Sequence, residues 1–324
     1  MRAAWLRIGG VALLALAVAV GVGAAVSRLR PDLARPADGP FAPLPFDRID
    51  VEERLESPVV DHALRLARSQ GIDRLVSLTG GFFGNGLETQ LAAAARHVGQ
   101  VKVFMNLDPR GCCGEDWSAR EAARVASGRA AGAAGLFLDA GGPVALDAPP
   151  LERVLEECLR LRLPVAVKVA GPADVAALSR AAGRRPGLAL LALGLDLPPA
   201  EVQALLARHP ALHVSVGVRL AAWARDPAGA RAAVLAHPDR FLFGTSVALG
   251  LSGKDEVEVR NVGRDAAQVR DFYSAQYRFF ESRDPHIPVP EGTAAGGLGL
   301  PRAALHRLYH RNAERLLGFA AERG

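Results

Sequence analysis

Charged and polar side chains recur at the ends of short apolar segments of this sequence. They are Glu52, Arg54, Asn106, Asp108, Asp139, Lys168, Asp196 and Ser246. If these segments are parallel strands of a barrel, their carboxyl ends meet at one mouth, and we expect the side chains to converge there. Buried charges must be paired, because an isolated buried charge is very costly. The sequence therefore predicts either an internal network of ion pairs or a polar pocket.

Two cations, Arg54 and Lys168, dominate this set. A pair of fixed cations suits an acidic small molecule, and Glu52, Asn106 and Ser246 would complete the ligand-binding site. This pocket and the ion-pair network are alternatives that the residues alone leave open.

Lys168 also allows a chemical role. It stands between apolar Val167 and Val169, and a desolvated lysine beside another cation can form a Schiff base with a carbonyl compound. Such a reaction needs an acid–base partner, for which Asp139 and Asp196 are the candidates. The candidate catalytic residues are therefore Lys168, Asp139 and Asp196.

Eight apolar segments alternate with amphipathic helical stretches from residue 46 onwards. They cover residues 48–51, 74–78, 101–107, 135–140, 164–170, 188–195, 212–218 and 240–246. This alternation predicts parallel strands joined by helices, and hence an α/β protein with a closed (β/α)₈ TIM barrel over 46–324. A doubly wound open sheet is the alternative, but its Gly-rich phosphate turn is not found.

Residues 1–30 predict a membrane anchor. Residues 8–26 are uncharged and almost wholly apolar, and such a run can cross a bilayer as a single transmembrane helix. Residues 31–45 form a Pro-rich linker. A cleaved signal, which would leave a secreted or periplasmic chain, is the alternative.

The part after the eighth strand differs in composition. Residues 251–301 are charged, aromatic and Gly-rich, and we expect this insert to cover the barrel mouth as a lid. Residues 302–319 predict an amphipathic helix that closes the chain, with an apolar face of Leu305, Leu308, Ala313, Leu316 and Leu317.

Composition argues against nucleic-acid binding and against a Cys/His metal site. The net charge is +5 over 324 residues, but acidic and basic residues are interspersed, so no nucleic-acid partner is expected. A homo-oligomer remains open. Adjacent cysteines rarely bridge each other, and no Cys/His metal spacing occurs, so Cys112, Cys113 and Cys158 are expected to be incidental thiols.

Five segments resemble the amidohydrolase-related branch of the amidohydrolase superfamily. One of them, "FYSAQYRFFESRD", resembles a segment that follows the eighth strand in one subgroup. "HPDRFLFGTS" (237–246) resembles its eighth strand, which ends in Gly-Thr-Asp, and "LPRAALHRLYHRNAERLLGF" resembles its terminal helix. "LRLPVAVKVAGP" and "LLALGLDLPPAEV" resemble its fifth and sixth strands. The resemblance implies a TIM-barrel hydrolase in which a divalent metal such as zinc, manganese or iron activates water.

The metal positions of that family are replaced in this sequence. By the resemblance, Glu52 and Arg54 stand where two histidines belong, Lys168 and Gly194 replace two more, and Ser246 replaces the catalytic Asp. An arginine cannot bind a metal, and a lysine does so only after losing its proton.

We therefore predict a catalytically degenerate, membrane-anchored pseudoenzyme that acts in ligand binding or as a scaffold, with no cofactor. The alternative is an active metal-dependent hydrolase with a rearranged site. Its metal would be held by residues drawn from Glu52, Asp139, Asp196, His62, His97 and His286. A Schiff-base lyase that uses Lys168 is the less favoured alternative.

Overall fold

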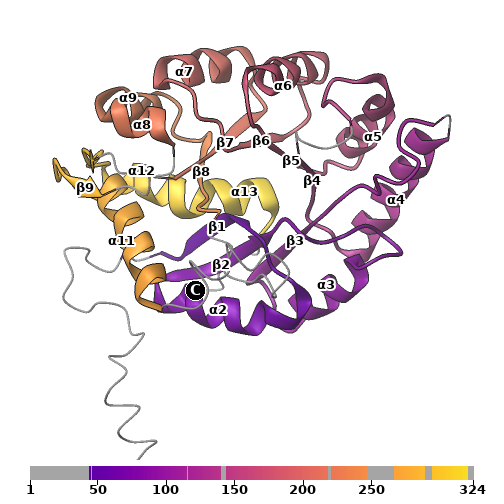
Figure 1. The fold of residues 1–324 in the computed structure, drawn as a ribbon, viewed down its shortest axis with the longest axis horizontal. Coiled ribbons are helices and arrows are strands. Elements are labelled where there is room, and N and C mark those ends of the chain that lie inside the picture. The colour runs from indigo at the N-terminus through magenta and orange to yellow at the C-terminus, as the bar shows by residue number, and fades with distance from the viewer. Residues whose placement is uncertain are drawn as a thin grey trace, which may run out of the picture. The chain divides into compact units, whose positions relative to one another are not determined.

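The computed structural model describes residues 44, 46–114, 116–139, 144–217, 220–246, 266–288 and 294–319. Eight strands form one parallel sheet in which each strand pairs with the next along the chain (Figure 1). The first and last strands are joined by a bond from Ser246 N to Glu52 O of 3.0 Å. The architecture is therefore a nearly closed (β/α)₈ barrel, as the alternation of segments predicts.

All eight predicted strands are present, with ends shifted by a few residues. Their bounds are β1 Arg48–Glu53, β2 Ile72–Ser77, β3 Val101–Met105, β4 Gly135–Asp139, β5 Val165–Lys168, β6 Leu190–Leu193, β7 Leu212–Val216 and β8 Phe241–Phe243. A separate antiparallel pair consists of β9 (Ile287–Pro288) and β10 (Ala294–Ala295).

Helices alternate with these strands around the outside of the barrel (Figure 1). Between β1 and β8 they are η1 Ser57–Val59, α2 Val60–Ser69, α3 Leu87–Ala95, α4 Trp117–Ala131, α5 Pro149–Arg160, α6 Pro172–Arg184, α7 Pro199–Arg208, α8 Ala221–Arg225 and α9 Pro227–Ala236. Four of them, α5, α6, α7 and α9, begin with proline. Proline suits this position because its fixed φ is helical and the first turn needs no N–H donor.

The end of the barrel opposite the mouth is closed by the C-terminal helical segment, α12 (Arg302–His306), η2 (Arg307–Arg311) and α13 (Asn312–Leu317). In Figure 1 it runs across the middle of the ring of strands. Ala313 and Leu317 belong to the same buried cluster as Ile49 and Leu242 inside the barrel. Residues 302–317 are thus helical, and their apolar side chains pack on the barrel.

The lid prediction is wrong for the helix of the insert that the structure describes. α11 (Ala266–Glu281) lies against the outside of the barrel, where Tyr277 and Phe280 pack on Phe243 of β8. Its apolar side chains recur at helical spacing, so one stripe of the helix can be buried against the strands. Residues 251–265 lie outside the described residues.

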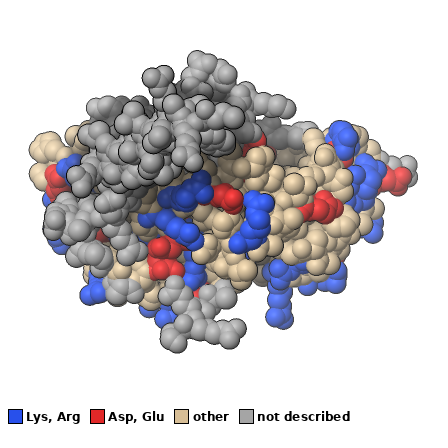
Figure 2. Space-filling model, turned by 90° about the horizontal axis from the view of Figure 1, so that it is seen from below, with Lys and Arg blue, Asp and Glu red and all other residues tan. Residues whose placement is uncertain are grey.

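The predicted anchor, residues 1–30, lies outside the described residues, as does the linker except for Leu44. Among the described residues, no helix is long and apolar enough to cross a membrane. On the face drawn in Figure 2, basic and acidic side chains lie interspersed, in agreement with their distribution along the sequence.

His213, at the second position of β7, is expected to make stability depend on pH. Burial lowers its pKa to about 4, and the cation of Arg240 adds to this. Between pH 6.5 and about 4, His213 therefore binds a proton in the unfolded chain but not in the folded chain. The free energy of unfolding falls as the pH falls through this window. The loss should reach about 2–3 kcal/mol.

Chemical denaturation at pH 7 and pH 4.5 checks this expectation. His213→Gln should be less sensitive to acid than the unsubstituted chain by about 2–3 kcal/mol. His62→Gln is the control, because His62 is exposed on α2. Equal acid sensitivity of the His213 variant and the unsubstituted chain would contradict the prediction.

Candidate ligand site at the barrel mouth

Strand β1 ends in an irregularity that places its acidic side chains on different sides. The pairing of β1 with β2 shifts between Asp50 and Glu53, so β1 carries one residue more than its partner. Glu52 accepts a hydrogen bond from Ser215 Oγ of β7 at 2.9 Å. Gly244 makes this contact possible, because a Cβ there would overlap Ser215 Oγ and lie 2.9 Å from Glu52 Cβ.

Asp50 and Glu53 are fully buried on the side that faces α11, and sequence reasoning missed both. Asp50 accepts hydrogen bonds from Thr245 Oγ1 at 2.5 Å and Tyr273 OH at 3.2 Å. The same two hydroxyls lie 3.5 Å from Glu53 Oε1. Burial raises the pKa of Asp50 above its usual value, although the bond from Thr245 opposes this. These carboxylates join β1 to β8 and α11.

Lys168 and Asp139 come together at the mouth, as two of the candidate residues were expected to do. They are paired neighbours at the ends of β5 and β4, with Nζ and Oδ2 3.9 Å apart. Their side chains are 43% and 47% exposed. The contact is therefore a loose, solvated ion pair at a strand end.

Asp196 has a structural role. Its Oδ1 accepts a hydrogen bond from Ala222 N at 2.7 Å, near the start of α8. A carboxylate at this place satisfies an N–H group that the helix itself cannot bond. The Asp196 side chain therefore bonds to the start of α8 and does not form an acid–base pair with Lys168.

The other predicted ligand-binding residues occupy the ends of β1, β3 and β8. Asn106 joins two loops, accepting from Gly81 N at 2.9 Å and donating to Leu78 O at 3.0 Å. Ser246 has a positive φ of 54° and its N–H bonds to β1. Arg54 follows β1 with a partly buried side chain.

Asp108 organises the loop between β3 and α4. Its carboxylate accepts bonds from Arg110 Nε at 2.9 Å and Arg124 Nη1 at 2.9 Å, and its own N–H donates to Glu121 at 2.9 Å. The side-chain bond from Arg110 is the main reason why the pKa of Asp108 lies well below its usual value. Trp117 Nε1 donates to Asp108 O at 2.9 Å. Asp108 is thus a structural centre, not an open ligand donor.

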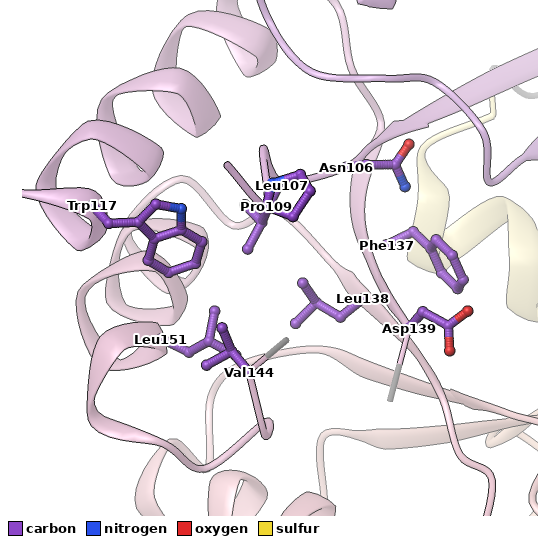
Figure 3. Close-up of a pocket in the computed structure, with 9 residues that line it drawn as sticks. All are labelled: Asn106, Leu107, Pro109, Trp117, Phe137, Leu138, Asp139, Val144 and Leu151. Carbon is purple, nitrogen blue, oxygen red and sulfur yellow. The ribbon is translucent and has the colours of Figure 1, made fainter. Parts of the chain in front are cut away.

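A cavity of about 200 Å³ lies beside this loop, between the ends of β3 and β4 and helices α4 and α5. Figure 3 shows Asn106 and Asp139 at one side of it and apolar side chains at the other. The apolar lining includes Leu107, Pro109, Trp117, Leu138, Val144 and Leu151. Because Asp139 also contacts Lys168, the cavity adjoins the ion pair at the mouth.

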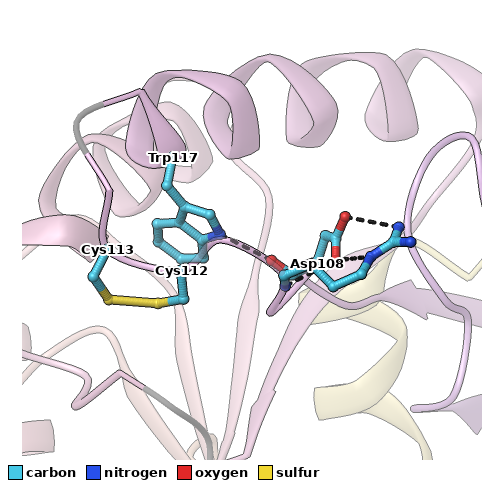
Figure 4. The surroundings of a disulfide bond; sticks show 5 residues. Asp108, Cys112, Cys113 and Trp117 are labelled. Atoms are coloured by element: carbon cyan, nitrogen blue, oxygen red, sulfur yellow. Dashed lines mark hydrogen bonds and ion pairs between the residues drawn. A yellow bond between two sulfur atoms is a disulfide. The ribbon is translucent and has the colours of Figure 1, made fainter.

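The expectation of incidental thiols is wrong for Cys112 and Cys113. The structure joins them by a disulfide in the loop after β3 (Figure 4). The chain turns sharply here, with positive φ values at Gly111 and Cys113, and this turn allows neighbouring side chains to meet. Cys158 is a free, buried thiol, as expected.

A sequence match to a protein-family model decides the family of this chain. The model described as amidohydrolase matches residues 59–319. The chain belongs to the amidohydrolase family. No curated protein matches it in sequence.

Solved structures with this fold are distant in sequence. A putative 2-pyrone-4,6-dicarboxylic acid hydrolase from Pseudomonas putida is 18% identical, with a TM-score of 0.54 over 87% of this chain and 100% of that chain. An organophosphorus hydrolase from Deinococcus radiodurans is 13% identical, with a TM-score of 0.51 over 89% and 99%. At these identities the similarity shows the barrel fold and nothing finer.

Among the described residues, the side chains at the strand ends of this amidohydrolase-family member do not fit the metal on which the family usually depends. A divalent ion of this kind prefers neutral imidazoles and carboxylates. The fifth strand instead ends in an ammonium group 3.9 Å from Asp139, and the Glu52 carboxylate accepts a bond from Ser215. Over the described ranges, no three His, Cys, Asp or Glu side chains are grouped so that they could hold an ion.

The histidines of the proposed rearranged site lie on the surface. His62 and His286 are exposed, and His97 Nε2 lies 2.6 Å from the exposed Asp61. Asp196 is occupied at α8. The structure thus does not assemble the six residues of the rearranged hydrolase site.

Proposed function

We propose that this amidohydrolase-family member is a non-hydrolytic binding protein for a small acidic molecule. The observation that carries the proposal is Lys168, a half-exposed cation at the end of β5, only loosely paired with Asp139 at 3.9 Å. A solvated ion pair of this length contributes little, about 0–1 kcal/mol, so an incoming carboxylate can replace Asp139 as partner at small cost.

The cavity supports a ligand with an apolar part. Its acidic group would lie at Lys168, and its apolar part would enter the cavity between Phe137 and Trp117. An apolar cavity of about 150 Å³ can hold a single small ring, so about 200 Å³ admits a group of similar size. Asn106, Arg54, Glu52 and Ser246 are the further polar groups of the proposed site.

Water activation has little support from the chain's own groups. Ser246 replaces the carboxylate that would act as base, and a hydroxyl is no substitute for it at neutral pH. A Schiff-base lyase also has less support, because a reactive lysine needs desolvation and the Lys168 side chain is 43% exposed.

Lys168→Ala is expected to abolish the thermal shift that small carboxylic acids produce. At a hundredfold excess over Kd, a bound acid stabilises the folded chain by about 2.7 kcal/mol. This corresponds to a rise in Tm of about 4–5 °C for a domain of this size. Differential scanning fluorimetry with a panel of mono- and dicarboxylic acids measures it.

Lys102→Ala is the matched control. Lys102 lies at the start of β3, with its Nζ 5.5 Å from the ring centroid of Phe319, so it belongs to the opposite end of the barrel. It should leave the acid-dependent shift intact. If the acids raise the Tm of the Lys168→Ala variant and of the unsubstituted chain equally, Lys168 does not bind the ligand, and a scaffold role is the alternative.

Metal content tests the competing hydrolase. We expect no stoichiometric zinc, manganese or iron after loading and desalting residues 40–324. About one equivalent of metal that is lost in Glu52→Gln or Asp139→Asn would establish a rearranged hydrolase instead. Trapping at Lys168 by borohydride with a carbonyl compound would favour the lyase.

We further propose that residues 8–26 anchor the barrel to a membrane, because this run is uncharged and long enough to span the bilayer. The full chain should then stay in the membrane pellet after carbonate extraction, while a chain from residue 40 should be soluble. A mature chain that begins near residue 27 would indicate a cleaved signal.

A further inference from the structure

The disulfide between Cys112 and Cys113 is not expected to stabilise the fold. A disulfide stabilises a fold by closing a loop of chain, and the gain in the free energy of unfolding grows with the number of residues in that loop. Two adjacent cysteines enclose none. The loop is held instead by bonds from Asp108 to Glu121 and from Trp117 to Asp108. The bond therefore calls for a role other than stability.

The pair is accessible to reagents in solution. Cys113 is exposed and Cys112 is half-buried, in a loop that follows the carboxyl end of β3 and so lies on the mouth side of the barrel. Exposed disulfides are the ones that exchange readily with thiols. Cys158 differs in both respects, because it is 0% exposed and burial raises its pKa to about 12.

The backbone at Cys113 is strained. Its φ is 72°, a left-handed conformation that favours glycine and costs about 1–2 kcal/mol for other residues. Such a conformation persists where its surroundings impose it, and it is typical of functional sites. Here the turn at Gly111 and Cys113 imposes this conformation and brings the side chain of Cys113 to that of Cys112.

We propose that Cys112 and Cys113 form a reversible two-electron redox site that exchanges with thiols. A donor thiolate attacks the exposed Sγ of Cys113, the disulfide breaks, and Sγ of Cys112 leaves as a thiolate that takes up a proton. A second donor thiol then displaces the first from Cys113. The chain gains two electrons and two protons, and two donor thiols become one disulfide. Oxidation by a small disulfide reverses both steps.

Alkylation under native conditions tests this inference without reference to the ligand. The full chain, purified in mild detergent without reductant, is treated with iodoacetamide before and after incubation with millimolar dithiothreitol. Peptide mass spectrometry should find no adduct before reduction and two adducts after it, on Cys112 and Cys113. Oxidised glutathione should restore the unreactive state. Cys158 should stay unlabelled throughout.

Two further measurements keep the inference falsifiable. Cys113→Ser should leave one thiol at Cys112 that is alkylated without reduction and does not cycle. The Tm should change by less than about 3 °C on reduction, because no loop of chain is released. Adducts on both cysteines before any reductant, reduction only after denaturation, or a larger fall in Tm would each overturn the proposal.

Discussion

Replacing Trp117 by alanine is expected to lower the free energy of unfolding by about 3–5 kcal/mol. Trp117 begins α4, is 1% exposed, and donates from Nε1 to Asp108 O at 2.9 Å. Alanine removes both the packing of the ring and this bond. The cavity of about 200 Å³ beside the indole would also grow, because close-packed neighbours collapse only partly into a new space.

Trp117→Phe distinguishes the contribution of the aromatic ring to stability from that of the hydrogen bond. It keeps an aromatic ring but leaves the Asp108 carbonyl without its donor, so about 1–3 kcal/mol should be lost. Guanidinium denaturation of both variants measures the difference. An alanine variant as stable as the unsubstituted chain would mean that this loop does not pack on α4 as described.

Replacing Arg124 by methionine is expected to cost about 3–5 kcal/mol, because it removes one partner of a buried charge network. Arg124 Nη1 lies 2.9 Å from Asp108 Oδ2 and 2.5 Å from Glu121 Oε1. The Glu121 side chain is 0% exposed. Methionine fills a similar volume, so the loss reports mainly the charge.

Arg120→Met is the matched control on the same helix. Arg120 is exposed, so its replacement should change stability by less than about 0.5 kcal/mol. Arg124→Lys keeps the charge but not the fork of donors, and an intermediate loss is expected. Urea denaturation at pH 7 compares the three variants. Equal losses from Arg120→Met and Arg124→Met would contradict the network.

The sequence by itself determined the strands, their order and the family. Apolar segments such as 101–107 and 212–218 are bounded by helical stretches, and this local pattern depends only on neighbouring residues. The motifs at 237–246 and 300–319 can also be recognised from the sequence, because each is one short continuous segment. The position of Lys168 and Asp139 at the mouth followed from their place at strand ends, since parallel strands bring those ends together.

Only the tertiary structure decided how the charged side chains are used. Asp196 is as well placed in the sequence as Asp139, yet it bonds to the start of α8. Asp50 and Glu53 became buried because α11, more than 200 residues later, brings Tyr273 against β1. In a regular strand Asp50 and Glu53 would point to opposite faces, but the added residue in β1 brings both to the side of α11. The periodicities of strands and helices, two and 3.6 residues, do not reveal such contacts between distant elements.

The loop after β3 shows the same limit. That Cys112 and Cys113 are adjacent was visible, but a bond between them depends on the turn made by positive φ values at Gly111 and Cys113. Asp108, which accepts hydrogen bonds from Arg110 and Arg124, holds this loop in place. Local sequence determines which elements form, because hydrogen bonds and side-chain periodicity are local. Contacts between distant elements determine which charges are paired, because pairing requires the chain to be folded.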